Sequence, residues 1–164
     1  MKCPDCGLEN IPGADDCAGC SASLVNAGSL TPKRGMEKKI LEGTLSDLSP
    51  KKASLVSPED PLLKAVTAMR AAKVGCVLAV ENGRCVGILS ERQLILNTPE
   101  TQDLAQTPVK AVMYPNPNCL REDDEVAVVF NRMAFSGHLH APVLFKDGSY
   151  GVVSARDLLR YLCK

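Results

Sequence analysis

The C-terminal two thirds of the chain repeat one pattern at a constant offset of 64 residues, and this repeat limits the possible folds more than any other feature. Identical residues recur at that offset in the pairs Asp60 and Asp124, Met69 and Met133, Gly87 and Gly151, Ser90 and Ser154, Arg92 and Arg156, and Leu94 and Leu158. Each unit is too short to bury a large core alone, so we expect two units that pack together.

Each unit predicts the same order of elements: an extended segment, an amphipathic helix, a hairpin of two strands and a final helix. An Asn-Gly or Asp-Gly pair marks each hairpin turn. The apolar residues of the two first helices recur at helical spacing, at Leu62, Ala65, Val66 and Met69, and at Val126, Val129, Phe130 and Met133. The predicted ranges are 53–56, 61–72, 76–80, 85–89 and 91–96 in the first unit, and 117–120, 125–136, 141–145, 150–153 and 155–162 in the second.

This β-α-β-β-α unit resembles the cystathionine β-synthase (CBS) domain. The resemblance rests on VLAVENGRCVGILSERQL at 77–94, on APVLFKDGSYGVVSARDL at 141–158 and on AVMYP at 111–115. It implies an α/β (α+β) fold in which tandem CBS repeats, 45–100 and 107–164, pack sheet against sheet as a Bateman module. It also implies a homodimer through the CBS repeats, for which we expect the helix faces around Val126, Val129 and Phe130 to need cover.

In the CBS family, the cleft between paired repeats binds adenine nucleotides or S-adenosylmethionine beside the motif Gly-h-h-(Ser/Thr)-x-x-Asp. The second repeat has the whole motif, with Gly151, Ser154, Arg156 and Asp157. The resemblance implies that Asp157 accepts the ribose hydroxyls and that Ser154 and Arg156 face the phosphates at a helix N-terminus. The other residues that we assign to this site are His140, Leu120 and Pro142.

The first repeat departs from the motif, because Gln93 stands where the family has Asp. An amide brings no charge, so we expect a weaker site there. Its candidate ligand residues are Ser90, Arg92 and Val56. Both Ser-x-x-Gln and Ser-x-x-Asp also fit a helix capping box that needs no ligand. For His140 and its neighbour His138, a surface turn is the alternative interpretation.

Four of the eight cysteines form two Cys-x-x-Cys pairs with ten residues between them, at Cys3, Cys6, Cys17 and Cys20. Two such turns bring four thiolates to one point, which favours a structural Zn²⁺ site over a redox pair or two disulfides. Residues 1–25 also resemble the short zinc-ribbon modules of bacteria and archaea, in which the metal, sometimes iron, is structural. The other cysteines are predicted to be small buried hydrophobes: Cys76, Cys85, Cys119 and Cys163.

The charge and composition of the chain disfavour several classes of function. The 19 basic and 19 acidic residues balance and aromatic residues make up 4%, which disfavours a nucleic-acid partner. Residues 1–30 are acidic and residues 31–52 are basic, and a basic linker over 26–44 contains a short predicted helix at 33–42. No apolar run is long enough to cross a membrane, and neither a signal peptide nor a catalytic motif is present, so we expect a cytoplasmic protein that is not an enzyme.

The sequence therefore predicts a regulatory module that binds an adenosine-containing small molecule, namely AMP, ADP, ATP or S-adenosylmethionine, in the cleft of a CBS pair. The zinc ribbon would then be a structural part or a docking part for an unknown protein target. The alternative is a nucleic-acid-binding or transcription-associated regulator, in which the ribbon and the basic linker contact DNA or RNA and the CBS pair acts as the switch.

Overall fold

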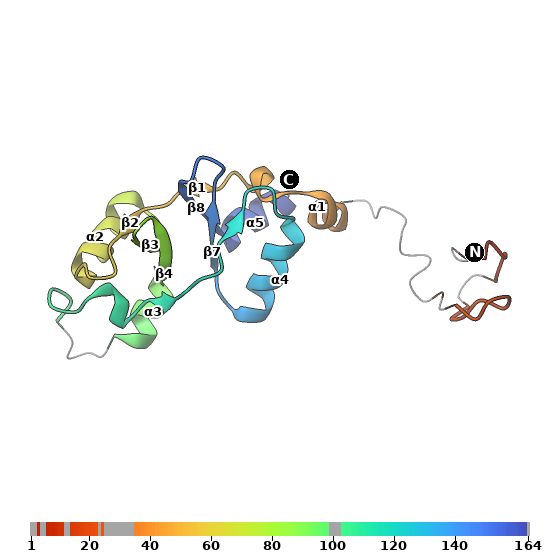
Figure 1. Ribbon diagram of the computed structural model, residues 1–164, viewed down its shortest axis with the longest axis horizontal. Helices are drawn as coiled ribbons and strands as arrows, with labels where there is room; N and C mark the ends of the chain where they lie inside the picture. The colour runs from red at the N-terminus through yellow and green to blue at the C-terminus, as the bar shows by residue number, and fades with distance from the viewer. Residues whose placement is uncertain are drawn as a thin grey trace. The chain divides into compact units, whose positions relative to one another are not determined.

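The computed structural model describes residues 3, 6–11, 14–22, 24, 35–98 and 103–163. The chain divides into two compact units, Met1–Lys39 and Ile40–Lys164 (Figure 1). The helix expected over 33–42 appears as α1 (Met36–Glu42), and the first residues of that range lie outside the described residues. None of the described helices is long and apolar enough to cross a membrane.

The first unit is built on two matching turns, one for each Cys-x-x-Cys pair. The backbone N–H of Gly7 donates to the carbonyl oxygen of Cys3 at 3.0 Å, and that of Ser21 donates to Cys17 at 2.9 Å. The backbones of Gly7 and Ser21 are in the left-handed region, with φ of 75° and 57°, a conformation that glycine adopts without strain. Cys3, Cys17 and Leu24 are buried together. The cluster is small, and units of this kind commonly take folding free energy from a bound metal.

The second unit contains two β-α-β-β-α repeats. The first consists of β2 (Leu55–Val56), α2 (Leu62–Ala72), β3 (Cys76–Glu81), β4 (Arg84–Ser90) and α3 (Glu91–Asn97). The second consists of β6 (Leu120–Arg121), α4 (Val126–Ser136), β7 (His140–Leu144), β8 (Tyr150–Ser154) and α5 (Ala155–Leu162). Each repeat is preceded by a short 3-10 helix and a two-residue strand: η1 (Leu45–Leu48) and β1 (Lys51–Lys52), and η2 (Val109–Ala111) and β5 (Tyr114–Pro115).

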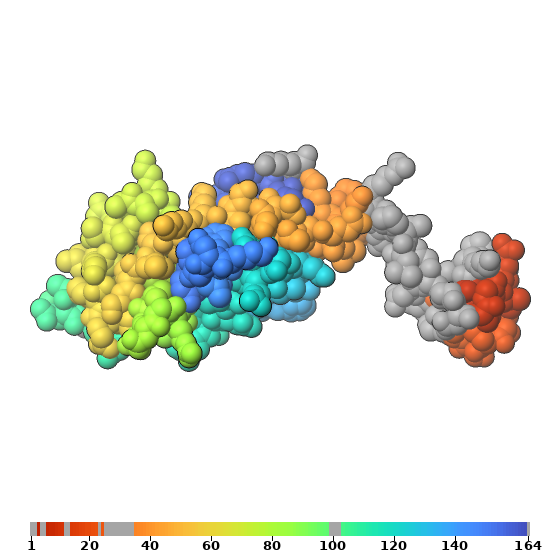
Figure 2. Space-filling model, turned by 45° about the horizontal axis from the view of Figure 1, so that its top comes forward, coloured from red at the N-terminus to blue at the C-terminus, as the bar shows by residue number. Residues whose placement is uncertain are grey.

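The two repeats exchange the short strands that precede them. One sheet has the order β2-β3-β4-β5 and the other has the order β1-β8-β7-β6. Strand β5 pairs with β4 of the first repeat, with Pro115 opposite Gly87, and β1 pairs with β8 of the second, with Lys52 opposite Gly151. In the space-filling view the β1 segment runs against the blue β7–β8 hairpin (Figure 2). The expected extended segments correspond to β2 and β6, whereas β1 and β5 were not anticipated.

The exchange explains the glycine of the repeated motif in the second repeat. A Cβ on Gly151 would lie 3.1 Å from the carbonyl oxygen of Lys51 and 2.5 Å from Cζ of Phe145. A side chain at this position would therefore displace the ring of Phe145 and crowd the β1 backbone.

Each repeat has its own core. The 3-10 helix that precedes one repeat packs into the core of the other. Leu45 of η1 is buried with Val126 and Val129 in the second repeat, and Val109 of η2 is buried in the first. Val126 and Val129 have no exposed surface, so the prediction that they need cover from a second chain is wrong: the chain covers them itself. Phe130 remains 36% exposed.

Candidate ligand-binding site

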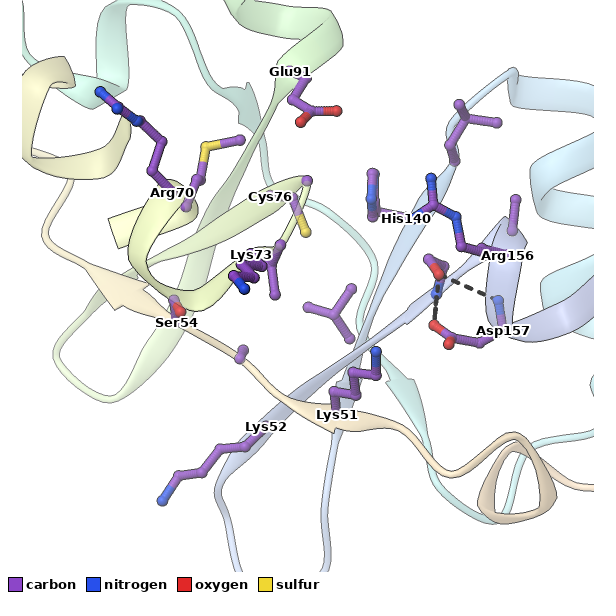
Figure 3. Close-up of a pocket in the computed structure, with 18 of the residues that line it drawn as sticks. Lys51, Lys52, Ser54, Arg70, Lys73, Cys76, Glu91, His140, Arg156 and Asp157 are labelled. Carbon is purple, nitrogen blue, oxygen red and sulfur yellow. Dashed lines mark hydrogen bonds between the residues drawn. The ribbon is translucent and has the colours of Figure 1, made fainter. Parts of the chain in front are cut away.

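A cavity of about 720 Å³ lies between the two repeats. The first repeat lines it with residues of α2, the start of β3 and α3, and the second repeat with residues of β7, β8 and α5 (Figure 3). The exchanged strand β1 and the two residues after it form a further wall. The volume is in the range of small-molecule sites, and its position means that one ligand would contact both repeats.

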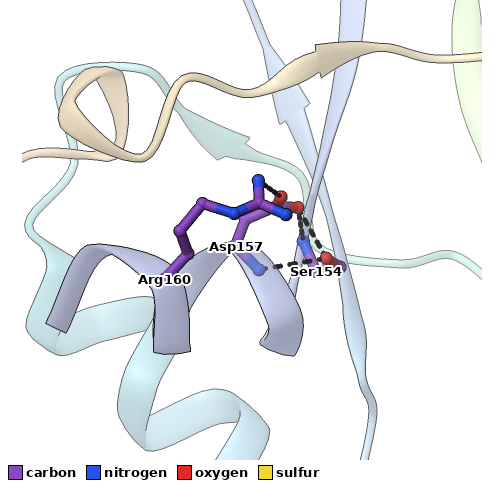
Figure 4. A network of polar contacts seen from close by, with 3 residues as sticks. All are labelled: Ser154, Asp157 and Arg160. Carbon is purple, nitrogen blue, oxygen red and sulfur yellow. Dashed lines mark hydrogen bonds and ion pairs between the residues drawn. The ribbon is translucent and has the colours of Figure 1, made fainter. Parts of the chain in front are cut away.

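Asp157 lies in the first turn of α5, at the cavity wall, and is 9% exposed. Its Oδ2 accepts hydrogen bonds from the Ser154 hydroxyl at 2.5 Å and from the Ser154 backbone N–H at 3.0 Å (Figure 4). Its Oδ1 accepts from Arg160 at 3.3 Å. The capping-box interpretation is thus confirmed for the second repeat. It does not exclude a ligand, because a carboxylate has about four acceptor positions and these bonds use three.

The first repeat forms the same box with an amide. Gln93 Oε1 accepts from the Ser90 backbone N–H at 3.2 Å and from the Ser90 hydroxyl, and both residues are buried. Neither Ser90 nor the exposed Arg92 lines the 720 Å³ cavity, and Val56 is buried in the core of its own repeat.

The structure brings together four of the residues assigned to the second site. Ser154, Arg156, Asp157 and His140 all line the cavity. Leu120 and Pro142 are buried and are not among the lining residues, and Leu120 belongs to the core of the second repeat.

His140 begins β7, is half-buried and faces the first repeat across the cavity (Figure 3). A Cβ built on Gly75 would lie 3.0 Å from His140 Nε2 and 3.3 Å from Glu91 Oε2, so the two side chains converge from different repeats. Burial lowers the pKa of His140 below 6.5; Glu91 and Asp157 raise it in part and Arg156 lowers it further. The imidazole is therefore neutral at pH 7. Because His140 lies in a strand at the cavity wall, the surface-turn interpretation is wrong for this residue.

Basic side chains dominate the charge of the cavity. Two acidic side chains line it, from Glu91 and Asp157. Seven basic side chains line it, from Lys51, Lys52, Arg70, Lys73, His140, Arg156 and Arg160. With His140 neutral, six cations face two carboxylates, and a cleft with such an excess concentrates anions.

Sequence reasoning missed most of these basic residues. Lys51 and Lys52 fall in the basic stretch 31–52, whose charges the sequence assigned to no small-molecule site. Arg70 and Lys73 lie at the C-terminal end of α2, where basic residues are common for reasons of helix stability alone. Only the packing of the two repeats shows that these side chains surround the same space.

The four N-terminal cysteines form the second candidate site. Their Sγ atoms lie within 4.8 Å of one another, with Cys3 to Cys20 at 3.7 Å and Cys6 to Cys17 at 3.5 Å. Tetrahedral Zn²⁺ with four thiolates requires sulfur–sulfur distances of roughly 3.8 Å, so the cluster fits the metal. The Gly19 backbone N–H, 3.4 Å from Cys17 Sγ, contributes most to lowering the pKa of Cys17 to about 6.

A cation would also resolve the crowding of four sulfurs. The backbone N–H of Ala22 lowers the pKa of Cys20, but the neighbouring thiols outweigh it and raise that pKa to about 12. Four adjacent thiolates repel one another unless a metal neutralises them, and Zn²⁺ does so by direct coordination.

The family model of the CBS domain matches residues 45–98 and 109–164, which cover both repeats. The chain belongs to the CBS domain family. The second unit is thus a tandem CBS pair, and the exchange of β1 and β5 between its repeats completes the two sheets of a Bateman module. The cysteine cluster in the first unit is consistent with a zinc ribbon.

Relatives are similar mainly over the CBS pair. A CBS domain-containing protein of Arabidopsis thaliana is 31% identical over 121 residues, which are 73% of this chain but only 21% of that protein. A CBS domain protein from Pyrobaculum aerophilum, solved in complex with AMP, matches with a TM-score of 0.62 and 22% identity over 73% of this chain and 98% of that one. A conserved CBS domain protein of unknown function from Thermoplasma acidophilum matches with a TM-score of 0.65 and 23% identity over 73% of this chain and 68% of that one.

Proposed function

We propose that this protein is a regulatory module that senses an adenine nucleotide in the 720 Å³ cavity of its CBS pair. The observation that carries the proposal is the placement of Ser154 and Asp157 at the N-terminus of α5, beside a set of basic side chains from both repeats. The carboxylate suits ribose hydroxyls, and the helix N-terminus with its surrounding cations suits phosphates. The AMP complex of the Pyrobaculum relative supports the same ligand class.

The charge of the cavity favours a nucleotide over S-adenosylmethionine. S-adenosylmethionine carries a sulfonium cation, which six cationic side chains would repel, whereas each phosphate of AMP, ADP or ATP would be attracted. Arg156 and Lys73 approach the cavity from different repeats (Figure 3), so phosphate binding would draw the repeats together.

The corresponding positions around the first motif lack these charges. The register that pairs Lys52 with Gly151 pairs Pro115 with Gly87, so Tyr114 and Pro115 correspond to Lys51 and Lys52. At the offset of 64 residues the remaining basic positions correspond to Ala134, Gly137, Cys76, Arg92 and Leu96. Only one of seven is basic, which supports a single dominant site for each chain.

The remaining parts of the proposal concern the ribbon and the assembly. We assign Zn²⁺ to Cys3, Cys6, Cys17 and Cys20 as a structural ion, and we assign the first unit a role in docking an unidentified protein target. A homodimer through the CBS repeats is supported by the exposed apolar side chains of α4, where Val128 is 41% and Phe135 is 90% exposed.

Isothermal titration calorimetry tests the nucleotide proposal directly. The zinc-loaded full chain is titrated with AMP, ADP, ATP and S-adenosylmethionine, each at low and high salt. We expect at least one nucleotide to bind at one site per chain, with affinity that falls as salt rises, and S-adenosylmethionine to bind at least tenfold more weakly.

A matched pair of variants locates the site. Arg156→Gln removes a cation from the cavity wall, whereas Arg92→Gln removes the corresponding cation from the first repeat, outside the cavity. We expect only the first variant to weaken nucleotide binding, by about tenfold. Failure of all three nucleotides to bind, or equal losses in both variants, would refute the assignment.

A further inference from the structure

Asn10 is a buried polar side chain in the first unit, and the sequence assigned it no role. It lies between the two Cys-x-x-Cys pairs and is 9% exposed. Among the residues of this unit that the structure describes, the others that are buried are Cys3, Cys17 and Leu24. A buried amide is normally hydrogen-bonded, so the partners of Asn10 indicate what this residue does.

The amide of Asn10 joins the two Cys turns. Its Nδ2 donates to the carbonyl oxygen of Leu8 at 3.0 Å, and the same oxygen accepts the Cys3 backbone N–H at 2.8 Å. Its Oδ1 accepts the backbone N–H of Ala18, inside the second turn, at 2.9 Å. One side chain thus fixes the segment that leaves the first turn against the turn that contains Cys17.

The same amide also contacts a candidate metal ligand. Asn10 Nδ2 donates to Cys17 Sγ at 3.5 Å, and this contact is buried. The Gly19 backbone N–H donates to the same sulfur at 3.4 Å. Cys17 Sγ therefore has one N–H donor from the backbone and one from a side chain, and a substitution of Asn10 removes the second.

We propose that Asn10 is a positioning residue of the metal site, which orients the Cys17 thiolate and holds the two Cys turns at the separation that a tetrahedral metal requires. This inference rests on the assignment of Zn²⁺ to the four cysteines. Four thiolates around one Zn²⁺ keep an excess of negative charge, and an N–H donor withdraws part of it from the sulfur. Partners of this kind outside the ligand shell contribute about 10- to 100-fold to metal affinity.

Two substitutions of Asn10 separate charge from shape. Asn10→Asp keeps the shape and an oxygen for the Ala18 N–H, but it replaces the donor at Cys17 Sγ with a second carboxylate oxygen. Asn10→Ala removes the three hydrogen bonds described above without adding charge. Asn97→Asp is the matched control, because the Nδ2 of Asn97 donates to the carbonyl oxygen of Val112 within the second unit.

Competition between the full chain and a chromophoric chelator, under reducing conditions, measures the affinity for Zn²⁺. We expect Asn10→Asp to bind Zn²⁺ about 10- to 100-fold more weakly than the parent chain, Asn10→Ala to lie between them, and Asn97→Asp to equal the parent. A parent chain without affinity for Zn²⁺ would refute the metal assignment and this inference with it. Parental affinity in both Asn10 variants would refute this inference alone.

The absorption spectrum of the full chain saturated with Co²⁺ tests the contact with the sulfur itself. Its d–d bands report the tetrahedral geometry, and its charge-transfer band moves to longer wavelength as the thiolates become better electron donors. We expect Asn10→Ala to keep the d–d bands and to shift the charge-transfer band to longer wavelength, whereas Asn97→Asp should change neither. A charge-transfer band at the parental wavelength would show that Asn10 supports only the backbone, and would overturn its assignment to Cys17.

Discussion

The Asp157→Asn substitution separates the two roles that the structure allows this residue, helix cap and ribose acceptor. Asparagine keeps an oxygen that can accept the Ser154 N–H, a bond of 3.0 Å in the parent chain. It loses the ion pair with Arg160, whose side chain is 58% exposed. Pairs with an exposed partner contribute about 0–1 kcal/mol, and the two hydrogen bonds from Ser154 lose their charged acceptor, so we expect the free energy of unfolding to fall by about 1–3 kcal/mol.

The loss in nucleotide binding is measured separately from the loss in stability. Hydrogen bonds to a charged group contribute about 1.5–3 kcal/mol and those between neutral groups about 0.5–1.5 kcal/mol. If Asp157 accepts a ribose hydroxyl at its remaining acceptor position, the neutral amide loses about 1–1.5 kcal/mol, which is roughly a 5- to 12-fold weaker affinity. A residue that only caps α5 would show no such loss.

Calorimetry with the tightest of AMP, ADP and ATP measures the affinity, and thermal unfolding without ligand measures the cost to the fold. Gln93→Glu is the matched control, because Glu keeps the capping box of the first repeat and adds the charge that this position lacks. We expect that control to bind nucleotide like the parent chain. Parental affinity in Asp157→Asn would show that Ser154 and Asp157 form a helix cap only.

Three further outcomes are expected. Elemental analysis of protein purified without chelator should find one zinc per chain, and Cys3→Ser should lose that metal without changing the thermal unfolding of the second unit, whose cores contain no ribbon residue; metal-free parent protein would contradict this. Sedimentation of the full chain at micromolar concentration should show a dimer, and a monomer alone would refute the assembly. Because burial lowers the pKa of His140, the unfolded chain takes up a proton before the folded chain does, so stability should decrease as pH falls below about 6.5. Denaturant titrations across pH should show this decrease in the parent chain and in His138→Gln, and a smaller decrease in His140→Gln. If the free energy of unfolding of His140→Gln falls with pH as steeply as that of the parent, His140 is not the cause of the decrease.

The elements of the repeats could be predicted because their signals are local. Apolar spacing marks α2 and α4, and the Asn-Gly and Asp-Gly turns mark the β3–β4 and β7–β8 hairpins. The strands β1 and β5 have two residues each, too few for any periodic pattern. Strand β5 pairs with β4, more than two dozen residues earlier, and β1 pairs with β8 of the second repeat, so only the packed structure defines them. The error about Val126 and Val129 has the same origin, since η1 of the preceding segment covers them.

The candidate site also has one part that the sequence predicts and another part that only the packed structure shows. Ser154, Arg156 and Asp157 are contiguous in sequence, and a motif carries them. Lys73 ends its helix in a left-handed conformation, and its contribution to the cavity depends on how the first repeat sits on the second.

The strand exchange also determines how a bound nucleotide would act. Strand β1 comes from the chain before the first repeat but is hydrogen-bonded to β8, so a ligand that contacts both β1 and α5 stabilises a pairing that belongs to neither repeat alone. A ligand that binds only the folded pair adds RT ln(1 + [L]/Kd) to its stability, about 2.7 kcal/mol at a hundredfold excess over Kd. The cavity walls come from both repeats, so a bound ligand would stabilise the contacts between them. Under the proposed function, the relative arrangement of the two repeats is the property that a nucleotide would change, and a target protein that contacts both repeats would detect it.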